Sequence, residues 1–271
     1  MEKVLAVDSA SELGAAARGA VAACGSHGAL YPAWLAARAG VRAIVFNDAG
    51  IGKHSAGIAG VAWLAGLDIA ACAVDYRSAR IGDGADTVDC GMVTTVNDIA
   101  AAAGCRPGHP CRQALQCLLD EAPAPAPARM EIPEIGETRK RIANSGHREV
   151  WALDSITLSR PEDRRAVIVT GSHGALLGGR KDDGLPAADV FAAFFNDAGI
   201  GKDEAGVARL PVLDARGVAA AAVSCDTARI GDGRSTYDTG VIARLNETAR
   251  RLDLKEGMSA REAVARLVGL G

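Results

Sequence analysis

The sequence predicts an α/β protein made of two tandem copies of a Rossmann-like, mostly parallel sheet unit, related by pseudo-two-fold symmetry. Two observations predict this class. The chain repeats itself over nearly its whole length, and each copy alternates short apolar, β-branched runs with helical segments. Alternation of this kind favours parallel strands covered by helices on both faces.

Three segments occur twice, in the same order. Gly-Ser-His-Gly-Ala-Leu stands at 25–30 and 171–176, Phe-Asn-Asp-Ala-Gly-Ile-Gly-Lys at 46–53 and 195–202, and Ala-Arg-Ile-Gly-Asp-Gly at 79–84 and 228–233. We call these the first, second and third motifs. The spacing agrees apart from a small insertion near 179–182 in the second copy. Chance does not produce such agreement, so the chain is expected to be internally duplicated.

The copies divide the chain into three parts. We expect a first α/β repeat over 1–120, a connector over 121–148 and a second α/β repeat over 149–271. The connector begins with alternating Ala and Pro over 121–128, which favours extended geometry, and continues charged and irregular over 130–147. Such a connector would let the copies pack as the subunits of a homodimer do.

The second copy gives the clearest secondary-structure signals. Apolar runs at 166–170, 190–195 and 218–223 predict buried strands. The segment 204–216 is helical in character, with Pro211 expected to break it into two pieces and Gly217 to end it. Helices are also predicted over 239–252 and 259–267, the second opened by a capping box of Ser259 and Glu262.

Each motif begins at or shortly after the end of a predicted strand. Ligands of open α/β sheets bind beyond the carboxyl ends of the strands. The three motifs are therefore expected to gather at one rim, as one site per copy or as one shared cleft.

The first motif supplies a histidine between two glycines. His27 and His173 could transfer protons near neutral pH, with Ser26 and Ser172 as ligand contacts or nucleophiles. In the structural alternative, the histidine caps a carbonyl and the serine caps the next helix.

The second motif combines a glycine-rich loop with a lysine before a helix, which makes a plausible anion cradle. Its spacing is not that of a P-loop. Lys53 and Lys202 could hold a carboxylate or phosphate, and the aspartates could be a base, a metal ligand or an orienter of the histidine. The candidate pairs are Asn47 with Asn196 for ligand binding and Asp48 with Asp197 for catalysis. The structural alternative is an Asx-turn with a solvated lysine.

The third motif offers a guanidinium and a carboxylate. Arg80 and Arg229 could grip a carboxylate in a bidentate way, while Asp83 and Asp232 bind the ligand or move protons. The alternative is a turn closed by a structural Arg–Asp pair. Tyr76 aligns with a cysteine in the second copy, which argues against a two-cysteine racemase.

Composition excludes some partners. A formal charge of −3 leaves no basic footprint for nucleic acid, and no apolar stretch is long enough to cross a membrane. The start resembles no secretory signal, and seven cysteines are an odd number, so reduced thiols and a cytoplasmic location are expected. Cys105, Cys111 and Cys117 lack metal-site spacing around His109.

These observations favour an enzyme, first a hydrolase and otherwise a lyase or isomerase, acting on a small carboxylate- or amide-bearing metabolite. The His and Asp groups would move protons, and the Lys and Arg groups would bind the anion. The alternative is a non-enzymatic regulatory protein that binds a phosphate or nucleotide. The cofactor is unknown, a divalent metal at the Asp/His set is a third possibility, and a homo-oligomer is possible.

Overall fold

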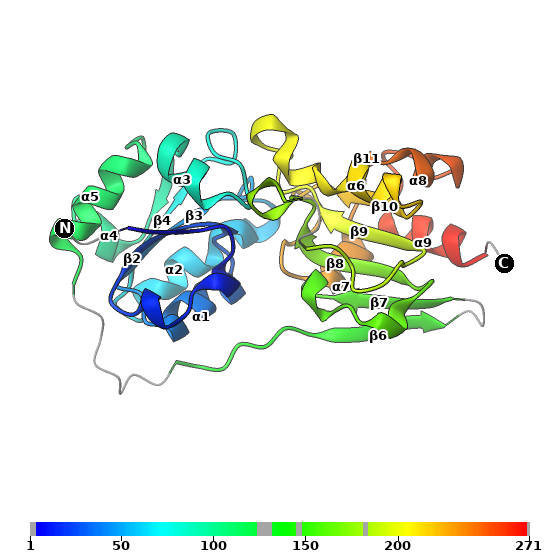
Figure 1. Ribbon diagram of the computed structural model, residues 1–271, viewed down its shortest axis with the longest axis horizontal. Helices are drawn as coiled ribbons and strands as arrows, with labels where there is room; N and C mark the ends of the chain where they lie inside the picture. Colours follow the sequence, from blue (N-terminus) through cyan, green and yellow to red (C-terminus); the bar gives the residue numbers. More distant parts are fainter. Residues whose placement is uncertain (1–3, 124–131, 145–147, 181–183, 270–271) are drawn as a thin grey trace.

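The computed structural model describes residues 4–123, 132–144, 148–180 and 184–269, and it contains two separate, mostly parallel sheets. Figure 1 shows the two sheets side by side, each with its own helices, and the described connector residues 132–138 running below them toward β6 (Arg139–Asn144). The predicted fold class is confirmed. The two-fold relation between the repeats stays a prediction.

The first sheet has the strand order β1-β2-β3-β4-β5. Strands β1 to β4 are parallel, and β5 pairs antiparallel with β4. The strands are Leu5–Val7, Val21–His27, Ala43–Asn47, Ala70–Val74 and Val93–Val96. The helices are α1 (Leu30–Ala39), α2 (Ala59–Ala65), α3 (Gly84–Cys90), α4 (Asp98–Ala102) and α5 (Cys111–Glu121).

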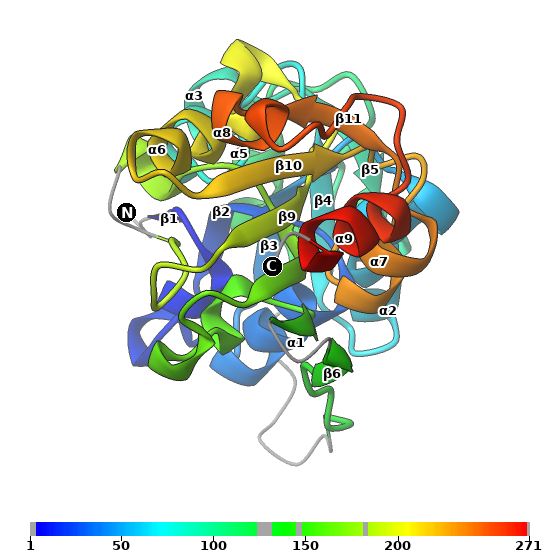
Figure 2. The ribbon, with the colours of Figure 1, turned by 90° about the vertical axis from the view of Figure 1, so that its right-hand side faces the viewer.

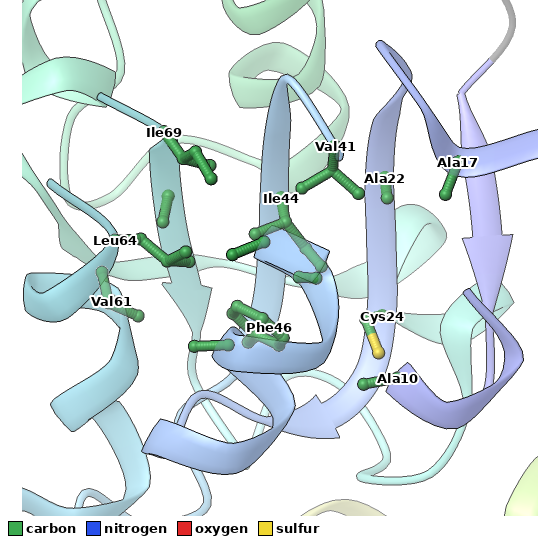
Figure 3. Packing of buried hydrophobic residues seen from close by; sticks show 14 of the residues in the cluster. Ala10, Ala17, Ala22, Cys24, Val41, Ile44, Phe46, Val61, Leu64 and Ile69 are labelled. Carbon is green, nitrogen blue, oxygen red and sulfur yellow. The ribbon is translucent and has the colours of Figure 1, made fainter. Parts of the chain in front are cut away.

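Alternate residues of the first sheet enter two different cores. Ile44 and Phe46 of β3 face α1 and α2, while Val45 between them faces α4 and α5. Figure 3 shows the first of these cores, with Val61 and Leu64 of α2 packed over β3. Because both faces are covered, the central strands β3 and β4 are apolar almost throughout, as expected for buried parallel strands.

The second sheet has the order β11-β10-β9-β8-β7-β6. Strands β7 to β10 are parallel, and the two outer strands are antiparallel to their neighbours. The strands are Arg139–Asn144, Glu149–Leu153, Val167–His173, Ala192–Asn196, Ala219–Val223 and Ile242–Leu245. The helices are α6 (Arg209–Ala215), α7 (Gly233–Thr239), α8 (Glu247–Arg251) and α9 (Ala260–Gly269), with α6 and α9 on opposite faces of the sheet (Figure 2).

Three predicted elements differ from the structure. Where one helix was expected over 239–252, the structure has the end of α7, then strand β11, then the short helix α8. Gly240 ends α7 and Asn246 caps α8. The break expected at Pro211 falls earlier, after the 3₁₀ segment Lys202–Val207, and Pro211 lies in the first turn of α6, where its missing N–H costs no hydrogen bond.

The connector is the third difference. Residues 139–144, expected to be irregular, form β6 and extend the second sheet. Before β6 the connector crosses α1, where Glu134 pairs with Arg38 at 2.9 Å. Most of the predicted Ala/Pro stretch, from residue 124 on, and residues 181–182 of the predicted insertion lie outside the described residues.

The part of the chain that the structure describes includes no helix both long enough and apolar enough to pass through a bilayer.

Candidate functional site at the junction of the repeats

The first and third motifs pack against each other within each repeat. The Gly82 N–H donates to the Gly25 carbonyl at 2.7 Å, and the Gly231 N–H donates to the Gly171 carbonyl at 2.8 Å. A Cβ on Gly25 would overlap the backbone of Asp83, so only glycine allows this approach. These glycines therefore serve backbone packing.

The two motif serines bond the backbone of their own repeats. Ser26 Oγ accepts the N–H of Ala10 at 3.0 Å, and Ser172 Oγ accepts the N–H of Ile156 at 2.9 Å. Each hydroxyl thus holds the 3₁₀ turn that follows the first parallel strand of its repeat, Ala10–Glu12 or Ile156–Leu158. This is a structural contact, different in detail from the expected helix cap.

The two motif histidines meet across the junction. Their ring centroids lie 6.1 Å apart, with the rings nearly perpendicular at 86°. Both side chains are buried, and burial lowers the pKa of His27 to about 4. Burial also lowers the pKa of His173 well below its usual value, and electrostatic repulsion from Arg209 and from His27 adds to this effect. Both rings are therefore neutral at pH 7.

The histidines differ in their hydrogen bonds. The Ala175 N–H donates to His173 Nδ1 at 3.2 Å. The buried Nδ1 of His27 has no hydrogen-bond partner among the described residues. Such an atom costs free energy, which marks His27 as the less satisfied of the pair.

The second-motif asparagines and aspartates serve their own loops. The side-chain oxygen of Asn47 accepts the Ala49 N–H, and the side-chain NH₂ of Asn47 donates to the Ala79 carbonyl. Asn196 makes the same two bonds in the second repeat, to Ala198 and Ala228. Asp48 accepts the N–H groups of Gly50 and Tyr76 and the Thr94 hydroxyl. Asp197 accepts the N–H groups of Gly199 and Cys225.

Burial raises the pKa of Asp48 and Asp197 against the pull of these hydrogen bonds. Neither carboxylate has a hydrogen bond to a histidine among the described residues. The described hydrogen bonds of the two aspartates therefore hold their own loops and include none that orients a histidine.

The loop of the second motif has a left-handed backbone. Ala49, Gly50, Ile51 and Gly52 all have positive φ, and the value of 62° at Ile51 is unusual for a β-branched residue. The N–H groups of these four residues already bond acceptors within the loop. An external anion would have to compete for them.

The two lysines cross from one repeat to the other. The Lys53 N–H donates to the Cys225 carbonyl at 2.8 Å, and the Lys202 N–H donates to the Tyr76 carbonyl at 2.9 Å. Lys53 Nζ reaches the Thr227 carbonyl and the Thr239 hydroxyl. Lys202 Nζ instead meets a carboxylate, that of Asp86, at 2.7 and 3.0 Å. Both proposed anion binders are thus engaged by the protein itself.

The third-motif aspartates cap helices. Asp83 Oδ1 accepts the Asp86 N–H at 2.8 Å, and Asp232 Oδ1 accepts the Ser235 N–H at 2.7 Å. Each also pairs with the arginine three residues before it, Arg80 or Arg229. Arg80 has two further acidic partners, Asp86 at 3.1 Å and Asp203 of the second repeat at 3.0 Å.

A small apolar core lies at the junction and contains residues of all three motifs. Its buried members come from both repeats and are mostly alanines, which lets the two backbones approach closely: Ala29, Ala49, Ile81, Ala175, Ala198, Ala205 and Ile230. The motif segments therefore build the interface between the repeats.

A cavity of about 360 Å³ opens beside this core. It takes part of its wall from each of three segments: the third motif of the first repeat, the loop after the first motif of the second repeat, and the segment after the second motif of the second repeat. The lining residues are Arg80, Ile81, Asp83, Leu176, Gly178, Gly179, Asp203, Ala205 and Ala208.

The two repeats differ beside this cavity. In the first repeat α1 follows the first motif and packs on α2, where Gly60 leaves room for it. In the second repeat the corresponding described residues form only the 3₁₀ turn Leu177–Gly179, and Arg209 aligns with Gly60. The Ala29 carbonyl accepts the Ala33 N–H of α1, whereas the Ala175 carbonyl accepts the Arg209 guanidinium.

Arg209 is almost completely buried, and burial lowers its pKa to about 10. It also donates to the His173 carbonyl at 3.2 Å and lies over the Phe195 ring at 5.0 Å. The arginine therefore replaces the absent helix as a donor and as a packing partner.

The structure thus brings only some of the candidate residues to one cavity. Arg80 and Asp83 line it; His27, His173, Lys53 and Lys202 do not. Sequence reasoning did not single out Asp203 and Asp86 as site residues. Their only signal was the difference between the copies, since Asp203 aligns with His54 and Asp86 aligns with Ser235.

Within the described part of the chain, no group of three or more His, Cys, Asp or Glu side chains is placed to hold a metal ion. No protein-family model, curated protein or solved structure matches this chain.

Proposed function

We propose that this protein is an enzyme that acts on a small polar metabolite bound in the cavity between the repeats. The observation that supports this most is the convergence of segments from both repeats on one cavity of about 360 Å³. Small-molecule sites commonly combine an apolar wall with a few converging polar groups, and this cavity does so. A hydrolase comes first among the reaction classes, followed by a lyase or isomerase.

In this proposal the groups that line the cavity carry the chemistry. Asp203 is the candidate for proton transfer, because its side chain is 63% exposed and Arg80 is its ion-pair partner. Arg80 holds that carboxylate in place through an ion pair at 3.0 Å. His27 and His173 hold the junction behind the site, since neither lines the cavity.

The regulatory alternative requires the second-motif loops to bind a phosphate or nucleotide. In both repeats the lysine of that loop already bonds the other repeat, through its N–H and through its ammonium group. Such a ligand would have to displace these contacts. This consideration supports the enzyme over the sensor.

A location in a reducing compartment, such as the cytoplasm, is part of the proposal. All seven cysteines are free, which fits a compartment that keeps thiols reduced. A homo-oligomer stays a proposal as well.

A ligand screen with two matched variants tests the site. We would screen small amides, amines, carboxylates and phosphates by thermal shift, using the wild type, Ala208→Leu and Ala59→Leu. Ala208 lines the cavity, and Ala59 is its counterpart in the first repeat. A bound compound should stabilise the wild type and Ala59→Leu but not Ala208→Leu.

Turnover then tests the enzyme. A compound that binds should be converted by the wild type, and Asp203→Asn should lose turnover while it still binds. Stabilisation that survives in Ala208→Leu would place the ligand elsewhere. Binding without conversion of any bound compound would favour the sensor.

A further inference from the structure

We infer that the cavity selects a small aliphatic ligand that carries a protonated amine, and this inference deepens the proposed function and rests on it. The ion-pair cluster that reaches the cavity carries a net negative charge. Two cations, Arg80 and Lys202, face three carboxylates, Asp83, Asp86 and Asp203, through direct ion pairs. The group therefore has one negative charge in excess.

Among the described residues, the cation that lines the cavity is Arg80, and it is already engaged by the protein. The Nε and one terminal nitrogen of Arg80 donate to Asp83 at 3.3 and 3.1 Å, and the other terminal nitrogen donates to Asp203 at 3.0 Å. The same guanidinium lies 3.1 Å from Asp86. A carboxylate ligand would have to displace one of these partners, whereas an ammonium group would add to the outer side of Asp203 and break no pair.

Lys202 does not change this balance. Its ammonium group points at Asp86, whose side chain is only 6% exposed, and both oxygens of that carboxylate are within hydrogen-bond distance. The hydrogen bond to Asp86 raises the pKa of Lys202, so the lysine stays charged and bound to its partner.

The other repeat shows that the fold does not need these acids. At the matching contact, Ser235 replaces Asp86 and accepts the Arg229 N–H through its hydroxyl. His54 stands in place of Asp203, and Arg229 has Asp232 as its acidic partner. The junction is thus held on that side without the additional carboxylates. Asp86 does not line the cavity and serves Lys202 and Arg80, whereas Asp203 lines the cavity and is 63% exposed, so its presence there calls for a separate reason. Recognition of a cation supplies it.

The rest of the wall fixes the body of the ligand. Ile81, Leu176, Ala205 and Ala208 offer an apolar surface beside the carboxylates. At Gly179 a Cβ would meet nothing within 4 Å, which leaves the rim open there. A short aliphatic chain with a terminal ammonium group matches this combination of surfaces.

Three probes of similar size test the ligand class: n-butylamine as its ammonium ion, butyramide and butyrate. Binding is followed at pH 7.5 by the amide NMR signals of Gly178 and Gly179, which line the cavity. We expect n-butylammonium to shift both signals with a Kd at least about fivefold lower than that of butyrate, the size of one partly exposed ion pair. The preference should shrink as salt increases.

Two acid-to-amide variants separate specific from general charge effects. Asp203→Asn should weaken n-butylammonium binding about fivefold. Glu204→Gln removes the neighbouring exposed carboxylate, which does not line the cavity, and should leave the Kd unchanged. Equal weakening by both variants would overturn the role of Asp203.

The outcomes also distinguish this inference from the proposed function. If butyrate or butyramide shifts the two glycine signals as strongly as n-butylammonium, the ligand class is wrong but the cavity is still a binding site. If none of the three probes shifts them, the inference fails together with the cavity as the substrate site.

Discussion

The ammonium group of Lys202, in the second repeat, lies 2.7 Å from a carboxylate oxygen of Asp86 in the first repeat. Burial opposes ionisation of Asp86, but the hydrogen bonds from Lys202 and from the Arg80 N–H outweigh it, and its pKa is lowered. In the described part of the chain, the ammonium group of the corresponding lysine, Lys53, bonds two neutral partners, the Thr227 carbonyl and the Thr239 hydroxyl. The two crossing contacts therefore share a backbone geometry but differ in charge.

We expect Lys202→Met to destabilise the protein more than Lys53→Met. The first variant removes one of the cations beside a buried carboxylate and should cost about 1–3 kcal/mol of unfolding free energy. Lys53→Met removes the hydrogen bonds that the Lys53 ammonium group donates to two neutral oxygens, and should cost about 1 kcal/mol of unfolding free energy. Urea denaturation measures both. Asp86→Ser, which copies Ser235, should recover part of the loss in the Lys202→Met background; equal losses in the two single variants would contradict the argument.

The buried histidine pair predicts a loss of stability in acid. The unfolded chain binds a proton at His27 near pH 6.5, whereas the folded protein does so only near pH 4. Stability is therefore complete above pH 6.5 and falls between pH 6.5 and 4, by about 3 kcal/mol for His27 alone. Asp48 and Asp197 act in the opposite direction, because their raised pKa favours protonation of the folded state.

His27→Gln isolates the histidine contribution. The unfolding free energy of this variant should depend less steeply on pH between 6.5 and 4 than that of the wild type. His54→Gln, at an exposed position, serves as the control and should keep the wild-type slope. An unchanged slope in His27→Gln would show that the ring is accessible to protons in the folded protein.

Glu137, in the connector, predicts a change in the opposite pH range. Burial, and then the charge of Asp154, raise its pKa to about 7 from the usual 4.5. The folded protein therefore favours the neutral acid, and this stability is lost as the pH rises from about 4.5 to about 7. Glu137→Gln should gain stability over the wild type at pH 8, by at most about 1 kcal/mol after solvent screening. The gain should vanish at pH 4.5.

A second connector variant supplies the comparison for Glu137. Glu134 is largely exposed and pairs with Arg38, so Glu134→Gln should show no gain at pH 8. Thermal denaturation at the two pH values measures both variants. A gain of the same size in Glu134→Gln would mean that the effect reflects net charge instead of burial.

Arg209 should be among the most sensitive positions of the second repeat. Arg209→Met keeps much of the apolar body but leaves the His173 and Ala175 carbonyls without their donor, at a cost of about 2–4 kcal/mol. Arg216→Met, which removes a half-exposed pair with Asp189, should have almost no effect. A similar small effect at both positions would show that water satisfies the two carbonyls.

The sequence predicted the sheets because their signals are local. The runs 166–170, 190–195 and 218–223 are apolar and β-branched or alanine-rich, and all three correspond to strands. The helix predicted over 239–252 was wrong because local stop and start signals interrupt its helical composition. Gly240 closes α7, and the side-chain oxygen of Asn246 accepts the Ala249 N–H as the cap of α8.

The candidate site was harder to predict, because its contacts join distant parts of the chain. Neither lysine has a local sign that its partner lies in the other repeat, 116 residues away for Lys202 and Asp86. The cavity wall includes the turn Leu177–Gly179, which the described residues of the second repeat form where the first repeat has α1, and the clearest sign of this difference is one aligned pair, Gly60 and Arg209. Glycine makes room for a helix, while arginine fills the space where none is present.

The covalent joining of the two repeats has a consequence for how this junction can change over time. In a dimer of identical chains, one mutation alters both symmetric positions at once, so a residue that suits one side is imposed on the other. Here one gene encodes each side separately, and Asp86 stands opposite a lysine while Ser235 occupies the matching position. Duplication followed by fusion thus allows one face to keep the assembly together while the other is free to acquire a chemistry of its own.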